Sequence, residues 1–421
     1  MHRTRLIVSS IAIIVAAPVA FSIEGATAGL IRAQAGDRQA PAAAERAAEL
    51  QPTKIVQSTV SDTLNDHSGT FRNAIADLNK RIPKTHLTDV LKDVNHSAQA
   101  PCGVPPTTDS VQFCWNDEDN AGTTWIPQGL TGSWDADADG RWNGHRVIAA
   151  TWYDAKGLNG TNRGSRITFV NYDNPRKPEY RHVLFVVPDR KGSFHAAKSH
   201  VGGIAWVGYR LYVADTTAIR VFDLHNVWRT RPDSSHKRIG MVDGKAYAAD
   251  YRYAIPQVGY YSSPVKPPKT PLRISSISLD RSSSPDSLIT AEYKEDCNGV
   301  HSTRPANARI VRWDLDRAGK LAGAGRRVVS SAAYVTSRAN INGAVTHGGK
   351  PEFVLTSSEC NRQPAWVHRA GLGTSQRYTS VRLGGPEDVT YQPQGGRIWT
   401  LTEYNGRRTV FGIPLSSIGD R

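Results

Sequence analysis

Acidic side chains recur at similar places along this chain, each at the end of a short run of β-branched and aromatic residues. They are Asp154, Asp215, Glu292, Glu359 and Glu403, with Glu387 and Asp388 close to the last of them. If those runs are equivalent strands of one repeated unit, the carboxylates surround one mouth of a common channel. A pair of them there could act as acid and base in glycoside cleavage. The alternative is that they are turn and strand-end hydrogen-bonding residues.

A second acidic group has the spacing of a calcium-binding loop. Asp135, Asp137 and Asp139 are followed by Gly140, so alternate aspartates could turn their oxygens toward one hard cation. Arg146 stands where an EF-hand requires a bidentate glutamate, which excludes a true EF-hand. The alternative is an exposed hairpin tip in which Asp and Gly form the turn. Calcium is the only cofactor that the sequence suggests.

Other catalytic signatures are missing from the sequence. It contains no GxSxG, HExxH, GxxxxGK or GxGxxG pattern. His200 and His347 stand at related places near glycine-rich segments, which fits a lyase-like pair as well as repeat symmetry. Five tryptophans could stack on sugars or anchor a partner, although core positions are the simpler interpretation: Trp115, Trp125, Trp134, Trp142 and Trp152.

The chain has four cysteines, an even number that permits three pairings. Cys102 and Cys114 are close enough in sequence to close a short loop, which leaves Cys297 with Cys360. A zinc site is disfavoured because no CxxC pair and no histidine at ligand spacing accompanies them.

Beyond Cys102, five segments share one pattern: a small, glycine-bearing strand, a tight turn, and a strand of β-branched and aromatic residues. They begin near Pro127, His200, Arg273, Ile341 and Gly385. Small residues allow inner strands to crowd a central channel, and bulky residues fill the widening space between blades. The pattern therefore predicts an all-β fold, a β-propeller with five legible repeats, rather than a two-sheet sandwich.

The number of blades stays open between five and seven, because the repeated region is long for five repeats of ~40 to 50 residues. The segments 183–187, 246–261 and 327–335 could be fourth strands or remnants of further blades. The last repeat ends soon after its third strand. A strand around 111–115 is therefore expected to supply the fourth and close the ring.

The N-terminal region differs in composition from the repeats. Residues 1–28 read as a signal peptide, with a basic start, an apolar run and a small-residue site at Ala26 to Ala28. Residues 29–101 resemble a linker or pro-segment that either docks on the main domain or is removed. Two helical faces are predicted within it, one with Leu64, Phe71, Ile75 and Leu78, the other with Leu87, Val90, Leu91 and Val94. Residues 102–421 form the predicted propeller domain.

The net charge of +14 gives the mature protein a basic surface. Since an exported chain does not meet nucleic acid inside the cell, anionic cell-wall polymers are the natural polyanions. No second apolar run follows the signal peptide, so a secreted protein without a membrane span is expected.

Four segments carry a resemblance to a known group: PQG at 127–129, HVGGIAW at 200–206, LYVADT at 211–216 and GGPEDVTY at 384–391. In these the chain resembles secreted Streptomyces β-propellers of the dispase autolysis-inducing type, which are transglutaminase substrates. The likeness covers most of the chain beyond Cys102. Its motifs are blade motifs, so they specify a fold rather than an active site.

The resemblance implies a non-enzymatic interaction protein. Its expected partners are an extracellular thermolysin-like metalloprotease, whose autolysis it would induce, and a transglutaminase that uses its glutamines. Gln363, Gln376, Gln128 and Gln257 are the candidate cross-linking residues by their loop or strand-end positions. The alternative function is a polysaccharide-binding protein or a glycoside hydrolase or lyase that uses the acidic residues at the channel mouth.

Overall fold

Strands dominate the chain, as the computed structural model shows for residues 53–155, 163–264, 271–295, 307–348, 351–358, 365–375 and 380–419. Of the helices in these ranges, the longest, α1 (Arg72–Asn79), has 8 residues. None of the described helices combines the length and apolar character of a transmembrane span. The expected signal peptide, residues 1–28, lies outside the described ranges.

The repeats fold into groups of four antiparallel strands, which we number in chain order. Sheet 1 contains β6 (Trp125–Gly132), β7 (Val147–Asp154), β8 (Ser165–Asn171) and β9 (Glu179–Pro188). Sheet 2 contains β11 (Gly203–Val207), β12 (Arg210–Asp215), β13 (Ala218–Asp223) and β17 (Tyr253–Ser262). Sheet 3 contains β18 (Ile274–Asp280), β19 (Ser287–Glu292), β20 (Ala308–Asp314) and β23 (Ala332–Thr336).

The last two groups follow the same order. Sheet 4 contains β24 (Ile341–Thr346), β25 (Phe353–Ser357), β26 (Trp366–Ala370) and β28 (Ser380–Arg382). Sheet 5 contains β29 (Pro386–Gln392), β30 (Arg397–Thr402), β31 (Thr409–Pro414) and, from far earlier in the chain, β5 (Val111–Cys114). The segments offered as possible fourth strands therefore contribute β9, β17 and β23, the outer strands of sheets 1 to 3.

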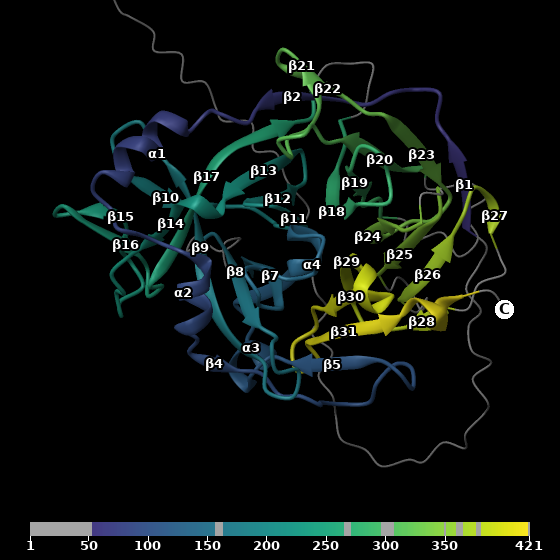
Figure 1. Ribbon diagram of the computed structural model, residues 1–421, viewed down its shortest axis with the longest axis horizontal. Coiled ribbons are helices and arrows are strands. Elements are labelled where there is room, and N and C mark those ends of the chain that lie inside the picture. The colour runs from purple at the N-terminus through teal and green to yellow at the C-terminus, as the bar shows by residue number, and fades with distance from the viewer. Residues whose placement is uncertain are drawn as a thin grey trace, which may run out of the picture. The chain divides into compact units, whose positions relative to one another are not determined.

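The first strands of the sheets, β6, β11, β18, β24 and β29, lie at the centre, and each contacts the next (Figure 1). Later strands of each sheet lie progressively farther out. This radial order is that of a β-propeller and confirms the predicted fold class at that level; a two-sheet sandwich is excluded. Sheets 1 and 2 also join at their outer edges, where β17 runs parallel to β9 through Ala254–Pro256.

Apolar clusters fill the spaces between neighbouring sheets. One joins sheet 5 to sheet 1 and contains Phe113, Trp399, Trp152 and Ile148. Others join sheets 1 and 2, 2 and 3, 3 and 4, and 4 and 5. Trp115, Trp134, Trp142 and Trp152 are all less than 10% exposed, so they are core residues, as the simpler interpretation of the tryptophans holds.

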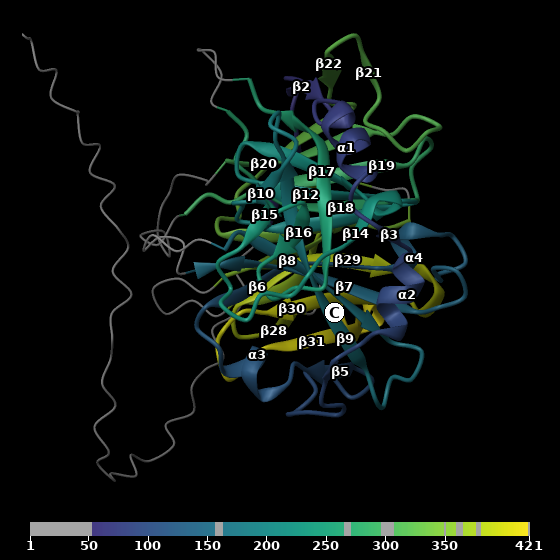
Figure 2. The same cartoon turned by 90° about the vertical axis from the view of Figure 1, so that its left-hand side faces the viewer.

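The N-terminal segment 53–114 forms a belt around the propeller. The belt contains β1 (Thr53–Gln57), β2 (Thr63–His67), α1, β3 (Lys84–Thr85), α2 (Leu87–Lys92), β4 (His96–Ser97) and β5. β1 pairs with β23, β2 with β17, β4 with β9, and β5 with β31. In Figure 1 the belt runs from purple to blue around the outside of the sheets, and in Figure 2 α1 and α2 face the viewer with β2 above them. The described part of the segment 29–101 is thus docked on the propeller.

The two predicted helical faces have different outcomes. α2 contains Leu87, Val90 and Leu91, all buried, but it ends at Lys92, before the predicted Val94. α1 buries Ile75 and Leu78 and begins after Phe71, which is its N-cap residue. Leu64, in contrast, lies in β2, so its assignment to the first helix is wrong. The backbone there pairs with the edge of β17, which overrides a helical spacing of apolar residues.

Several short strands add to the sheets or to the belt. They are β10 (Phe194–Ala196), β14 (Val227–Arg229), β21 (Gly323–Ala324), β22 (Arg327–Val329) and β27 (Gly373–Ser375). The hairpin of β15 (Ile239–Val242) and β16 (Lys245–Ala248) forms a separate two-stranded sheet. Two further helices, α3 (Asp117–Ala121) and α4 (Ser133–Ala136), lie on either side of β6 in the chain.

Candidate functional site

A polar cavity of about 390 Å³ opens where the sheets meet, and we call it the mouth pocket. Every sheet contributes to its lining, either from a strand or from the loop beside it. Its polar residues include Gln128, Tyr153, His200, Arg273, Ser275, Tyr293, Asn342, Ser358, Glu387 and Glu403. The cavity therefore depends on the radial arrangement and on residues that are up to 275 positions apart.

β-Bulges in the first strands turn the lining residues into the mouth pocket. The pairing of the first with the second strand skips Gln128 with Gly129 in sheet 1, Ser275 in sheet 3, Asn342 in sheet 4, and Glu387 with Asp388 in sheet 5. A bulge leaves its extra residue out of the ladder and redirects its side chain. The same irregularity in four sheets thus gathers polar groups at one place.

Glycines bring the first strands close enough to form this rim. A Cβ atom on Gly203 would lie 2.5 Å from the Ile277 nitrogen, and one on Gly343 would lie 2.8 Å from the Val389 nitrogen. Both contacts are with the first strand of the next sheet, so a side chain would force the sheets apart. This confirms the predicted role of small residues in the inner strands.

Two glutamates form the chemical centre of the mouth pocket. The carboxyl groups of Glu387 and Glu403 hydrogen-bond to each other, which requires one proton between them. Burial, together with the neighbouring Glu403 carboxyl group, raises the pKa of Glu387 well above its usual value. Burial also raises the pKa of Glu403. The pair consequently holds a proton under conditions in which isolated glutamates are ionised.

Carboxamides hold each member of the pair in place. Gln128 Nε2 donates to Glu403 Oε2 at 3.0 Å, and Asn342 Nδ2 donates to Glu387 Oε1 at 3.1 Å. Each carboxamide is less than 10% exposed and also donates to a strand carbonyl. The ring of Tyr153, whose pKa burial raises to about 12, stacks on His200 with a centroid distance of 4.7 Å.

Two more carboxyl groups are buried behind the mouth pocket. Asp388 Oδ2 accepts hydrogen bonds from the backbone N–H groups of Leu130 and Ile204, at 3.1 and 2.9 Å, so it ties sheet 5 to sheets 1 and 2. Burial raises the pKa of Asp388 well above its usual value. Asp135 accepts from the hydroxyls of Thr131 and Thr390, and burial raises its pKa to about 7.

The other predicted strand-end acids form ion pairs within their own sheets. Arg163 Nε lies 3.5 Å from Asp154 Oδ2, and Arg220 Nε lies 2.6 Å from Asp215 Oδ2. Glu292 is bound by Arg309 at 2.7 Å, which with its hydrogen bonds lowers the pKa of Glu292 although burial opposes this. Glu359 lies outside the described residues. The structure therefore brings together Glu387 and Glu403 but not the whole predicted ring.

The three aspartates of the calcium motif do not converge. Asp135 turns into the core, whereas Asp137 and Asp139 lie in an exposed turn in which they accept backbone N–H groups of Asp139 and Arg141. Gly140 has a φ of +79°, which the turn requires. The turn-forming interpretation therefore describes these residues, and the calcium hypothesis is not supported by their geometry.

The candidate histidines also lie apart. His200 lines the mouth pocket, whereas His347 lies in a different cavity with Asp135 and Tyr391. Burial lowers the pKa of both imidazoles. The lyase-like pair is therefore not formed.

The described candidate glutamines are not accessible. Gln128 is 3% exposed and belongs to the mouth pocket, and Gln257 is 2% exposed, with its carboxamide bonded to Arg220 and to the Gly259 carbonyl. A transglutaminase must reach the carboxamide of its substrate. The burial of Gln128 and Gln257 therefore disagrees with the expectation that they are cross-linking residues. Gln363 and Gln376 lie outside the described residues.

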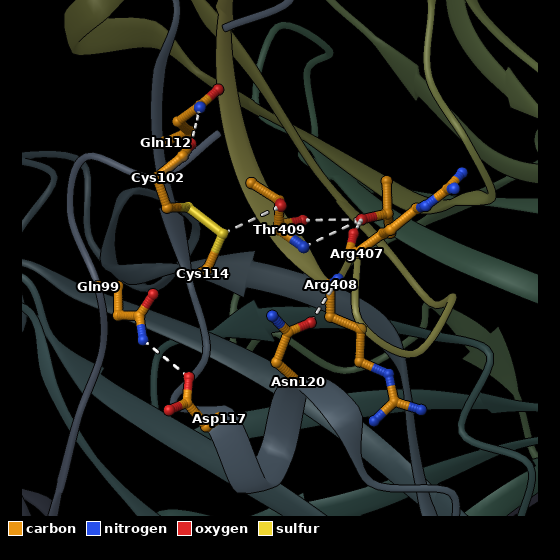
Figure 3. Close-up of a disulfide and its surroundings, with 10 residues drawn as sticks. Gln99, Cys102, Gln112, Cys114, Asp117, Asn120, Arg407, Arg408 and Thr409 are labelled. Carbon is orange, nitrogen blue, oxygen red and sulfur yellow. Dashed lines mark hydrogen bonds between the residues drawn. A yellow bond between two sulfur atoms is a disulfide. The ribbon is translucent and has the colours of Figure 1, made fainter. Parts of the chain in front are cut away.

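One disulfide, between Cys102 and Cys114, is formed as the short-loop pairing predicts, with a Cα–Cα distance of 5.9 Å. Figure 3 shows it beside the start of β31, where Cys114 Sγ lies 3.3 Å from Thr409 Oγ1. The bond anchors β5, the strand that the belt adds to sheet 5. Cys297 and Cys360 lie outside the described residues.

Sequence reasoning missed a group of potential metal ligands. Within the described residues, only His96, Asp119 and His182 bring three such side chains within 4.8 Å of one another. The Asp119 carboxylate is already bonded by Arg166 at 2.6 Å, Tyr180 at 2.7 Å and His182 at 3.0 Å. A cation there would face the buried Arg166 guanidinium, so these residues do not fit a metal ion. No spacing motif marks them, because β4, α3 and β9 bring them together.

Comparisons with protein-family models and with curated proteins gave no match. Similar solved structures include a GH43_1 enzyme from Xanthomonas citri, with 9% identity over 81% of this chain and 93% of that chain, at a TM-score of 0.33. The PQQ domain of pyranose dehydrogenase from Coprinopsis cinerea is 12% identical over 74% of this chain and 99% of that one, at a TM-score of 0.30. Hydrazine synthase from Kuenenia stuttgartiensis is 12% identical over 61% of this chain and 67% of that one, at a TM-score of 0.26. Such TM-scores assign neither family nor activity.

Proposed function

We propose that the protein is a saccharide-binding protein whose ligand, a neutral polyhydroxylated molecule, occupies the mouth pocket. The observation that carries this proposal is the proton-sharing pair of Glu387 and Glu403, fixed by two carboxamides inside a polar cavity. Such a pair offers both a hydrogen-bond donor and hydrogen-bond acceptors without a full charge on each carboxyl group. The hydroxyl groups of a sugar both donate and accept hydrogen bonds, so they match this combination. Tyr153 and Tyr293 add aromatic edges to the same cavity.

Binding is favoured over hydrolysis by the closeness of the two carboxyl groups. Glycosidases hold their two carboxyl groups roughly 5 Å or more apart, on opposite sides of the bond that they cleave. Glu387 and Glu403 are in direct hydrogen-bond contact. The remaining acids of the region are either buried behind the pocket or bound by arginines. Among the described residues that line the pocket, no further carboxylate lies opposite Glu387 and Glu403.

We also infer that the propeller has five blades and that β5 closes the ring. In the described residues, the first strands of sheets 1 to 5 contact one another in order around the centre. Each pair of neighbouring sheets also shares an apolar cluster. Export follows from the basic and apolar N-terminal sequence, and it would bring the pocket into contact with extracellular glycans.

The proposal is tested by titrating the protein with neutral mono- and oligosaccharides in a calorimeter. We expect a ligand from this set to bind, and Glu403→Gln and Glu387→Gln to weaken its affinity at least about tenfold, because each removes the shared proton or its acceptor. Glu179→Gln, on the outer strand β9, is the matched control and should leave affinity unchanged. Absence of binding across the set would contradict the proposal, and release of reducing ends would show that the pocket is hydrolytic instead.

A further inference from the structure

A second cavity, of about 330 Å³, lies beside α3 and the outer strands of sheet 1, and we call it the basic pocket. Five arginines line it: Arg163, Arg166, Arg181, Arg252 and Arg408. Against them stand three carboxylates, Glu118, Asp119 and Asp250. Two of the three histidines of the pocket do not add charge at neutral pH, since burial lowers the pKa of His96 and lowers that of His182 to about 4. The third, His236, has its Nδ1 3.2 Å from Asp250 Oδ1. Three of the arginines are already in ion pairs, Arg163 with Asp154, and Arg181 and Arg252 with Asp93. The two that remain, Arg166 and Arg408, are therefore the candidates to hold a ligand.

Two of these arginines are buried and keep an unused N–H group. Arg166 is 5% exposed and Arg408 is 1% exposed. Arg166 Nε and Arg408 Nη2 have no hydrogen-bond partner among the described residues. Buried guanidinium groups normally satisfy their donors, because a buried donor without a partner loses its hydrogen bond to water and gains none in return. Two unpaired donors at one cavity point to a missing acceptor.

Comparison of the sheets shows why Arg408 is unusual. In sheets 1, 2 and 3, an acid at the end of the second strand pairs with an arginine near the start of the third: Asp154 with Arg163, Asp215 with Arg220, and Glu292 with Arg309. In sheet 5 the same positions hold Glu403 and Arg408, but Arg408 Nε donates to the Glu403 backbone carbonyl at 2.8 Å. The Glu403 side chain turns to Gln128 instead.

The split pair leaves Arg408 without a carboxylate. Its Nη1 donates to the Asp119 carbonyl at 2.6 Å, and in the described part of the chain it forms no ion pair. Figure 3 shows Arg408 at the start of β31 next to Asn120 of α3, whose side chain accepts its backbone N–H at 2.9 Å. The position of the guanidinium is thus fixed by carbonyls and helix α3, while the nearby carboxylates of Asp119 and Glu403 act on its charge without forming an ion pair with it.

Arg166 is held rigidly at the same cavity. Its Nη2 donates to Asp119 Oδ1 at 2.6 Å, and its guanidinium lies over Trp125 and Trp152 at 4.7 and 4.8 Å from the ring centroids. Such stacking orients the planar group without using its donors. Asp119, in turn, is shared with Tyr180 and His182, so it neutralises only part of the local charge.

From this geometry we propose that the basic pocket binds an oxyanion, a carboxylate, sulfate or phosphate group, which accepts hydrogen bonds from Arg166 and Arg408. Arg163, Arg181 and Arg252 also line the cavity, each of them in an ion pair with Asp154 or Asp93. This site is separate from the mouth pocket and does not depend on the function proposed for it. An acidic saccharide end and a free inorganic anion offer the same chemistry, and the probes below distinguish them.

Calorimetric titration of the full chain with inorganic phosphate and, separately, with sodium glucuronate tests the proposal, with methyl glucoside as the uncharged probe. We expect at least one of the two anions to bind, and to bind more weakly at high ionic strength. Methyl glucoside should give the same signal with the unchanged protein as with the Arg408→Gln variant. Binding of phosphate alone identifies a free anion as the ligand. Binding of glucuronate identifies the charged group of an acidic sugar.

Three variants make the test specific. Arg408→Gln should weaken anion binding at least about tenfold, since it removes a charged hydrogen bond to the anion. Glu118→Gln removes an exposed carboxylate from the lining and should strengthen binding about twofold or more, in a variant whose fold is not at risk. Arg327→Ala, exposed on β22, is the control and should change nothing.

The proposal is overturned if neither anion binds, if Glu118→Gln and Arg408→Gln both bind as the unchanged protein does, or if binding is abolished by Glu403→Gln alone. Should Arg408→Gln fail to fold, Arg252→Ala replaces it, because Arg252 is exposed and its expected loss of affinity has the same sign.

Discussion

At the scale of single residues, four buried or half-buried carboxyl groups lie in or behind the mouth pocket. Burial raises the pKa values of Glu387, Glu403, Asp388 and Asp135. An acid with a raised pKa in the folded state binds protons more tightly than the unfolded chain does. Its contribution to stability is therefore favourable at low pH and is lost as the pH rises from the ordinary value toward the raised one.

Asp135→Asn tests this at one position. The pKa of Asp135 is about 7 in the folded protein, against 3.8 ordinarily, so the protein should lose stability between about pH 4 and pH 7. Across that range the free energy of unfolding of the asparagine variant should rise, relative to that of the unchanged protein, by on the order of 2–4 kcal/mol. Each tenfold change in proton affinity corresponds to roughly 1.4 kcal/mol. Denaturant unfolding at several pH values measures it.

Asp137→Asn is the control, because Asp137 lies exposed in the neighbouring turn. Its stability should follow the unchanged protein at every pH. A pH-independent difference between Asp135→Asn and the unchanged protein would contradict the assignment of a raised pKa to Asp135.

At the scale of elements, the first strands determine both the packing and the site. Their glycines permit adjacent strands to approach, and their bulges direct Gln128, Ser275, Asn342 and Glu387 into the mouth pocket. Regular strands would alternate their side chains between the two faces of a sheet and would not gather these groups.

Gly203→Ala should therefore destabilise the protein by about 1–3 kcal/mol, because the new methyl group would overlap the backbone of β18 at Ser276 and Ile277. Gly395→Ala is the matched control: its Cβ would meet nothing closer than 3.5 Å, and its effect should stay within about 0.5 kcal/mol. Equal effects of the two substitutions on the free energy of unfolding would show that the inner strands are not tightly packed.

At the scale of the whole molecule, the belt covers exposed sheet edges. It adds strands beside β23, β17, β9 and β31, and a disulfide anchors its end at Cys114. An uncovered edge strand can pair with another chain, so the belt protects the propeller from association through its edges. Helices α1 and α2 add apolar contacts to the outside of sheets 1 and 2.

The resemblance to secreted Streptomyces propellers makes a separate prediction for the whole molecule. Mixed with a thermolysin-type metalloprotease, the purified protein should accelerate the loss of intact protease on a gel. The same protein unfolded by heat is the control, since a docking surface requires the folded propeller. An unchanged rate of protease loss would leave the resemblance as one of fold alone.

The repeated pattern of small first strands and bulky second strands was sufficient to predict the all-β propeller, because glycine spacing and apolar periodicity are local properties of the chain. The short-range disulfide between Cys102 and Cys114 and helix α2 could be predicted for the same reason. The position of Leu64 in a strand could not be predicted, because β2 forms by pairing with β17 and β22, which are distant in the sequence.

For the candidate site, the sequence identified Glu387 and Glu403 among seven acidic candidates but could not separate them from the others. Asp154, Asp215 and Glu292 have equivalent positions, and only the arginine that each one meets in the folded sheet decides its role. The basic pocket had no sequence signal, because β4, α3, β8, β9 and the start of β31 join it from distant parts of the chain. Local patterns determine which strands form, whereas the partners of a charged side chain are determined by tertiary structure.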